Sequence, residues 1–176
     1  MIIFKEALSV SPDIYDILET DVLQTLQVLI NENPDYLIRY DLINREGLHI
    51  AGVPRLPQVP KPFLGLNPTL VNGMKVSLSA ALPSVSPVIL EPGTGNSHLY
   101  FASVVTTRDG RALGMMVATY DGYILQDIVE NRNDSAGATS FGILYDEIHI
   151  QLAHGIKPET NYRTLVALNE TLLETM

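Results

Sequence analysis

The chain has 176 residues, of which 46% are hydrophobic and 18% charged, a composition that suits one globular domain and argues against intrinsic disorder. Its formal net charge of −9, with only 11 basic residues, excludes the clustered Lys and Arg that nucleic-acid binding requires. The chain has no cysteine, so disulfides, thiolate nucleophiles and Cys-based metal sites are excluded as well.

The first element that the sequence predicts is a long amphipathic helix at 11–33. Residues 11–13 are Ser-Pro-Asp, which provide a capping residue, a proline at the first helical position and an acidic first turn. Apolar residues then recur at three- and four-residue spacing until Asn33-Pro34 ends the pattern: Ile14, Leu18, Val22, Leu26 and Leu29. We expect one face of this helix to be buried and the other to face solvent.

A β-hairpin is predicted next, with strands at 36–43 and 48–53. Between them Gly47 supplies the left-handed backbone conformation that closes such a turn. Five prolines between 54 and 68 favour a surface loop, because proline neither donates to a strand ladder nor continues a helix. Residues 70–82 are ambiguous but fit a short helix beside that loop.

The second half of the chain alternates between strands and helices. Three antiparallel strands are predicted around turn-rich segments, at 84–90, 98–106 and 111–120. A helix at 122–132 and a closing hairpin follow, the hairpin with strands at 140–145 and 148–153. Leu165, Leu168, Leu172 and Met176 share one helical face, which predicts a helix at 161–176. This order indicates an α+β fold built on one antiparallel sheet of about five or more strands.

Motifs for catalysis and metal binding are missing from the sequence. It contains no Gly-x-Ser-x-Gly elbow, no His-Glu-x-x-His motif and no phosphate-binding loop, so we expect neither an enzyme nor a cofactor. His149 and His154 have an odd spacing that places them on opposite faces of a strand, which argues against a metal pair. No run approaches the roughly 18 apolar residues of a membrane span, so any anchor is expected outside this chain.

Six segments, taken in order, resemble one family of sensor domains. They are 33–51, Lys61-Pro62-Phe63, 84–88, 99–105, 108–117, and 141–147 with 150–154. These are similar to the opening hairpin, a basic-Pro-aromatic step, two strands, an Asp-Gly turn with its strand, and the closing hairpin of the Cache superfamily. The resemblance covers nearly the whole chain, and it rests on the ordered set because no single segment is specific.

Cache domains are PAS-like sensors of bacterial chemoreceptors, sensor kinases and cyclases. The resemblance implies a single domain over 1–176, with a long N-terminal helix at 11–33, sheet and pocket at 36–153, and a C-terminal signalling helix at 161–176. It also implies the ligand-binding sensor of a membrane-bound receptor, located outside the cytoplasm and able to form a homodimer through its terminal helices. A catalytic output domain would lie elsewhere in the full-length protein. A ligand-free PAS-like dimerisation module and a cytosolic PAS or GAF sensor are the alternatives.

The resemblance further implies a pocket between the sheet and the Pro-rich loop for a small molecule, such as an organic acid or an amine. The candidate residues are Lys61, Phe63, Ser86, Tyr100, Phe101, Ser103 and Asp121. Lys61 can hold a carboxylate, whereas Asp121 can face a cationic group or cap the helix that follows. Tyr100 and Ser103 lie on opposite faces of one strand, so only one of them can line the pocket. Phe101, Ser103 and Val105 share a face and also fit the core. The amino-acid-binding members usually present a Tyr, Arg and Trp cluster before the pocket strands, and this chain has no tryptophan, which disfavours an amino-acid ligand.

Overall fold

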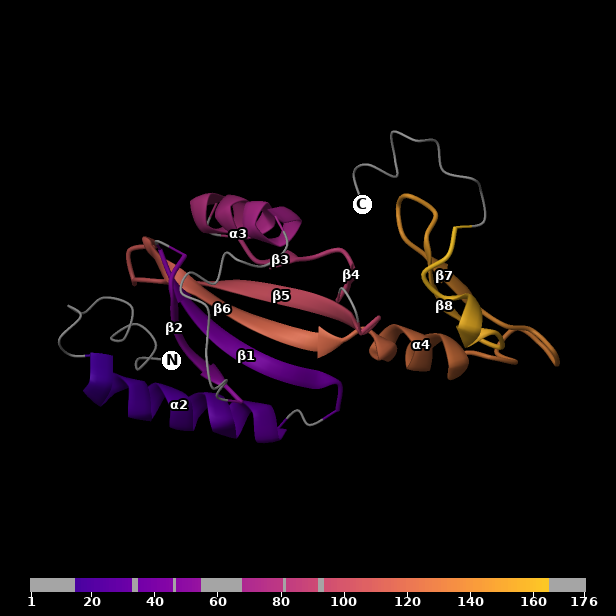
Figure 1. The fold of residues 1–176 in the computed structure, drawn as a ribbon, viewed down its shortest axis with the longest axis horizontal. Coiled ribbons are helices and arrows are strands. Elements are labelled where there is room, and N and C mark those ends of the chain that lie inside the picture. Colours follow the sequence, from indigo (N-terminus) through magenta and orange to yellow (C-terminus); the bar gives the residue numbers. More distant parts are fainter. Residues whose placement is uncertain are drawn as a thin grey trace. The chain divides into compact units, whose positions relative to one another are not determined.

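The chain forms two compact units, Met1–Asp121 and Gly122–Met176. This computed structural model describes residues 15–32, 35–45, 47–54, 68–80, 82–91 and 94–164, with the side chains of 15–21, 68–72 and 74 outside that description. Within the first unit, a helix lies on each face of a central antiparallel sheet (Figure 1). This arrangement confirms the predicted α+β class.

The central sheet has six strands in the order β2-β1-β6-β5-β3, with β4 also paired to β5. Their bounds are β1 Leu37–Asn44, β2 His49–Val53, β3 Ser84–Val85, β4 Ile89–Leu90, β5 Ser97–Thr106 and β6 Ala112–Asp121. The predicted hairpins β1–β2 and β5–β6 are both present and antiparallel. Gly47 and Gly110, in the two hairpin turns, have φ values of 80° and 85°, as the turns require.

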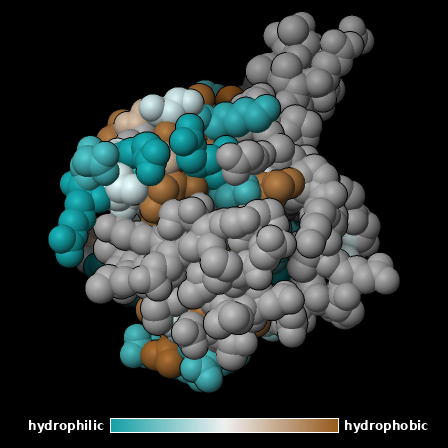
Figure 2. Space-filling model, turned by 90° about the vertical axis from the view of Figure 1, so that its left-hand side faces the viewer, coloured by the Kyte–Doolittle hydropathy of each residue, from teal (hydrophilic) through white to brown (hydrophobic). Residues whose placement is uncertain are grey.

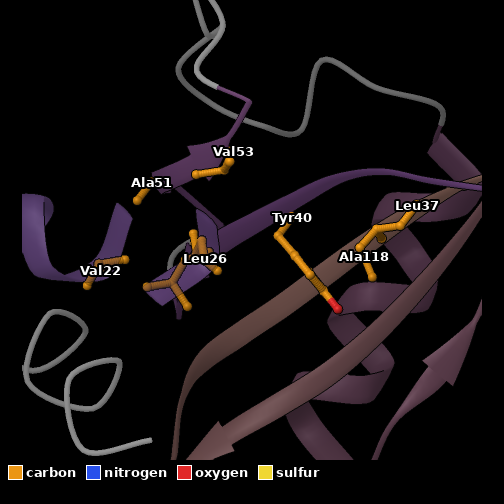
Figure 3. Close-up of a cluster of buried hydrophobic side chains, with 8 residues drawn as sticks. Val22, Leu26, Leu37, Tyr40, Ala51, Val53 and Ala118 are labelled. Carbon is orange, nitrogen blue, oxygen red and sulfur yellow. The ribbon is translucent and has the colours of Figure 1, made fainter. Parts of the chain in front are cut away.

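Helix α2 (Tyr15–Glu32) covers one face of the sheet and confirms the predicted long helix over the described residues. Val22 and Leu26 point from α2 into a buried cluster with side chains of β1, β2 and β6 (Figure 3). The other members of this cluster are Leu37, Tyr40, Leu42, Ala51, Val53 and Ala118. Burial of these side chains, at about 25 cal/mol per Å² of apolar surface, stabilises the packing of α2 on the sheet. We call this side of the sheet the α2 face.

Helix α3 (Pro68–Ala80) packs on the opposite side of the sheet, which we call the α3 face. Its Leu78 packs against a second buried cluster, which consists of Ile43, Ala102, Met115 and Val117. Side chains alternate along a strand, so β1 and β6 contribute to both faces. The helix also resolves the ambiguity of the sequence at 70–82.

The second unit contains α4 (Tyr123–Glu130), β7 (Ile143–Tyr145), β8 (Gln151–His154) and the 3-10 helix η3 (Pro158–Thr160). Gln126 connects these elements. Its amide nitrogen donates to the carbonyl oxygen of His154 at 2.9 Å, and its amide oxygen accepts from the His154 N–H at 3.1 Å and from Asn161 Nδ2 at 2.7 Å. The closing hairpin was expected in the central sheet, but β7 and β8 form a two-stranded sheet of their own.

The predicted strand at 84–90 is divided into β3 and β4. Pro87 lies between them and has no N–H to donate to a ladder. Ser86 replaces part of the lost pairing, since its N–H donates to the Tyr100 carbonyl at 2.9 Å and its Oγ accepts from the Tyr100 N–H at 3.0 Å.

The prediction of a helix beginning at Asn161 is wrong for residues 161–164. Their backbone groups pair with β8 instead: Tyr162 N–H donates to the Gln151 carbonyl at 2.6 Å, and Gln151 N–H donates to the Arg163 carbonyl at 3.0 Å. A helix would have to turn these groups along its own axis. The rest of the predicted helix, 165–176, lies outside the described residues.

The visible surface mixes apolar and polar groups. Small groups of apolar residues, in brown, lie among hydrophilic residues, in teal, in the coloured part of the view (Figure 2). This mixture is usual for a folded protein, whose surface is more than half apolar. No helix of the described residues is both long enough and apolar enough to cross a membrane.

Candidate functional site

A network of three charged or titratable side chains is buried on the α3 face, where β1 and β2 pair. Arg39 Nε donates to the two carboxylate oxygens of Asp41 at 2.7 and 2.8 Å, and Arg39 NH2 approaches Oδ1 at 2.7 Å. His49 Nε2 lies 2.7 Å from the same oxygen. The side chains of Arg39, Asp41 and His49 are only 12%, 2% and 8% exposed. Arg39 NH1 also donates to the carbonyl of Pro54, which follows β2.

The register of the hairpin brings these groups together. Arg39 and Asp41 are two residues apart on β1 and therefore share a face. Asp41 pairs with Gly52 and Ile43 pairs with His49 on the neighbouring strand, with a register shift between Leu42 and Ile43. A Cβ at Gly52 would overlap Asp41 Oδ1 and Arg39 NH2. Glycine at this position avoids the overlap, because the ends of charged side chains approach the backbone closely.

Tyr100 extends the polar part of this face from β1 to β5. Both Arg39 and Tyr100 are register partners of the buried Thr119 on β6, so the three residues lie side by side across the sheet. Burial raises the pKa of Tyr100, and the charges of Glu91 and Asp41 raise it further. The phenol therefore stays protonated at neutral pH and can both donate and accept a hydrogen bond. The His98 ring meets the Tyr100 ring edge to face, with centroids 6.3 Å apart.

Chemically, this face can bind a small polar molecule. Its polar groups are the Arg39 guanidinium, which Asp41 holds, the Tyr100 phenol and the Thr119 hydroxyl. They lie beside the apolar side chains of Ile43, Met115 and Val117. In the described part of the chain, no three His, Cys, Asp or Glu side chains gather as they would around a metal ion.

The ligand-binding residues that the sequence predicted are divided between the α3 face and the α2 face of the sheet. Tyr100 lies on the α3 face, and Ser86 is bonded to its backbone. Asp121 shares that face by strand alternation, at the exposed end of β6. The capping position of α4 is occupied by Gly122 and not by Asp121.

Phe101 and Ser103 lie on the α2 face, so the predicted opposition of Tyr100 and Ser103 is confirmed. Neither residue belongs to the core, because Phe101 is 43% exposed and Ser103 is also exposed. Phe101 instead packs edge to face on Tyr120, with centroids 5.3 Å apart. Lys61 and Phe63 lie outside the described residues, and their roles remain predictions.

Sequence reasoning missed Arg39, Asp41 and His49. Their signal was present in the predicted hairpin: Arg39 and Asp41 interrupt an otherwise apolar strand with opposite charges at the period of one strand face. Charges on one face of a strand usually face water, so this pattern indicates a buried pair only when the strand is covered on both faces.

The described elements match the ligand-binding domains of bacterial chemoreceptors. The sensory domain of the Campylobacter jejuni chemoreceptor Tlp3 (CcmL) is similar with a TM-score of 0.62 and 13% identity, over 98% of this chain and 67% of that one. The ligand-binding domain of the Pseudomonas aeruginosa PAO1 amino acid chemoreceptor PctC, in complex with GABA, has a TM-score of 0.58 and 20% identity, over 81% of this chain and 59% of that one.

The Pseudomonas fluorescens chemoreceptor CtaA, whose ligand-binding domain is in complex with L-alanine, has a TM-score of 0.57 and 17% identity over 93% of this chain. The chain spans 59–67% of the length of these three structures. No family profile and no curated protein sequence matches the chain. The fold is therefore the PAS-like fold of chemoreceptor sensor domains.

Proposed function

We propose that this chain, which has the fold of bacterial chemoreceptor ligand-binding domains, is the ligand-binding sensor domain of a membrane-bound signal-transduction protein. A small molecule binds on the α3 face, beside Arg39, Asp41, His49 and Tyr100. The domain itself carries out no chemistry on the ligand. It lies outside the cytoplasm, and any catalytic output belongs to another part of the full-length protein.

The buried network of Arg39, Asp41 and His49 carries this proposal. Removing charged groups from water costs free energy, and replacing a buried ion pair by apolar residues of similar size is often neutral or stabilising. Elsewhere the α3 face is apolar, at Ile43, Met115 and Val117. Apolar residues could therefore also have filled the positions of the charged network. Charges confined to one part of an otherwise apolar sheet face are better explained by recognition of a polar molecule.

Tyr100 is the candidate that connects the sequence-derived site with this network. Its hydroxyl group shares the α3 face with Asp41, and Asp41 influences its pKa. Ser86 and Asp121 adjoin it, and the proposal includes Lys61 and Phe63 on the basis of the Cache resemblance alone.

A ligand-free dimerisation module is the second candidate, and one observation favours it. The described part of α2 exposes an uncharged stripe of Gln24, Gln27, Val28 and Asn31, with Val28 55% exposed. A helix face without charges suits helix pairing between two copies better than isolated contact with water. Dimerisation and sensing are compatible, and only the absence of any ligand would favour the dimerisation module.

The test is a thermal-shift and calorimetry screen of the full chain with small organic acids, amines, GABA and L-amino acids. A true ligand at 100 times its Kd should stabilise the fold by about 2.7 kcal/mol, which is readily seen as a rise in Tm. Tyr100→Phe should weaken binding, whereas Phe101→Leu, on the opposite face, should leave it unchanged. A screen with no stabilising compound, together with a stable dimer on sizing, would refute the sensor function.

A further inference from the structure

The guanidinium of Arg39 has N–H groups that the protein does not use. A guanidinium carries five N–H donors. The single N–H of Nε donates to Asp41, one N–H of NH2 is assigned to the Asp41 Oδ1 that lies 2.7 Å away, and the Pro54 carbonyl takes one N–H of NH1. One donor on each terminal nitrogen is therefore left without an acceptor among the residues that the structure describes. Because the side chain is only 12% exposed, bulk water compensates these donors poorly.

Asp41, in contrast, is almost completely buried among donors, with only 2% of its side chain exposed. Its Oδ1 receives Arg39 Nε, Arg39 NH2 and His49 Nε2, all at 2.7 Å, and its Oδ2 receives Arg39 Nε at 2.8 Å. A ligand ammonium group could reach this carboxylate only by displacing one of these buried donors. The network therefore offers a bound molecule a cation, and not an anion.

We infer that Arg39 binds the carboxylate of the ligand through its two terminal nitrogens, with Asp41 and His49 as positioning residues. A planar carboxylate matches the spacing of two guanidinium donors and accepts both at once. Asp41 fixes the plane of the guanidinium from the neighbouring edge of Nε and NH2, and His49 in turn holds Asp41. This inference rests on the proposed sensor function and narrows its ligand from acids or amines to a molecule with a carboxylate.

The first experiment compares matched ligands on the unaltered chain by calorimetry. The pairs are GABA and its primary amide, L-alanine and L-alaninamide, and acetate and acetamide, with n-butylamine as the amine without an acid. In at least one pair, the acid should bind at least tenfold more tightly than its amide, since a charge-assisted contact is lost. Equal binding of acid and amide, or binding of the amine alone, would overturn the role of Arg39 and leave the sensor function standing. No binding by any compound of the wider screen would overturn both.

The second experiment replaces the Arg39 guanidinium by another group of the same charge. Arg39→Lys replaces the two-nitrogen fork by a single ammonium, so the acid should lose about tenfold in affinity while the amide changes little. Arg45→Lys, at the exposed turn of the same hairpin, is the matched control and should change neither. An unchanged preference for the acid in a folded Arg39→Lys variant would contradict the assignment.

His49 tests the positioning role. His49→Phe removes the donor to Asp41 and should lower the preference for acid over amide, whereas His49→Gln keeps a donor and should restore part of it. A purely structural His49 would change the Tm in both variants without changing this preference. That result would remove His49 from the assignment, and the comparison of acid and amide on the unaltered chain would still decide the role of Arg39.

Discussion

Replacing Asp41 by asparagine should destabilise the first unit strongly. The asparagine side chain keeps the shape of aspartate, but it leaves Arg39 without a counterion in a place where only 12% of the arginine side chain reaches solvent. One of its two terminal atoms becomes an amide nitrogen that faces other donors. Breaking a buried pair by removal of one partner typically costs about 3–5 kcal/mol, and the residual exposure of Arg39 places this case near the lower end. Such a loss is a large fraction of the total of about 5–15 kcal/mol that stabilises a domain.

Urea unfolding followed by circular dichroism measures this loss. With a urea dependence of about 1–3 kcal/mol per M, a cost of about 3 kcal/mol lowers the midpoint by roughly 1–3 M. Asp35→Asn, at an exposed position before β1, should stay within about 0.5 kcal/mol of the unaltered chain.

The double variant with leucine at both 39 and 41 should be more stable than Asp41→Asn, because no buried charge is then left alone. The reasoning fails if Asp41→Asn costs less than about 1 kcal/mol, or if the double variant is the less stable of the two.

Three further variants test other contacts. Gly52→Ala should cost about 1–3 kcal/mol in urea unfolding, since its Cβ would overlap the Asp41 carboxylate; a neutral result would mean that the network has room to move. Tyr100 has a pKa above its ordinary value of 10.0, so its contribution to stability is complete below about pH 10 and is lost as the pH rises through the higher folded value. Tyr100→Phe should therefore reduce the fall in Tm between pH 9 and pH 11, and an unchanged fall would contradict the pKa assignment. His154→Phe keeps an aromatic ring against Phe141 but removes the Nδ1 that accepts two backbone N–H groups of the following turn, so hydrogen exchange should accelerate in that turn.

Local patterns predicted most of the sheet. The hairpins β1–β2 and β5–β6 follow from alternating apolar residues around turns with Gly47 and Gly110, which are properties of neighbouring residues. The spacing of Val22 and Leu26 likewise predicted the buried face of α2.

The failures have non-local causes. The seam of apolar residues after 164 predicted a helix from Asn161, but pairing of residues 162–164 with Ile150 and Gln151 decides the backbone there. Helical spacing cannot reveal that a distant strand needs partners. In the same way, whether β7 and β8 would join the central sheet or form a separate one depends on contacts that no periodicity records.

Only part of the site was predicted from the sequence, because the rest depends on contacts between strands. Strand alternation was sufficient to separate Tyr100 from Ser103. Finding the network required the register between β1 and β2, because His49 meets Asp41 across the hairpin and Gly52 makes space for both. The opposite charges of Arg39 and Asp41 were visible in the sequence, and their value as a signal depends on knowing that the strand is buried on both faces.

Strand β1 has Arg39 and Asp41 on one side and Tyr40 and Leu42, which pack with α2, on the other. Because these residues alternate along one backbone, a twist of the strand about its long axis moves the two sets in opposite directions. We therefore expect a molecule that moves the guanidinium sideways to move the side chains packed against α2 the opposite way, across the thickness of a single strand.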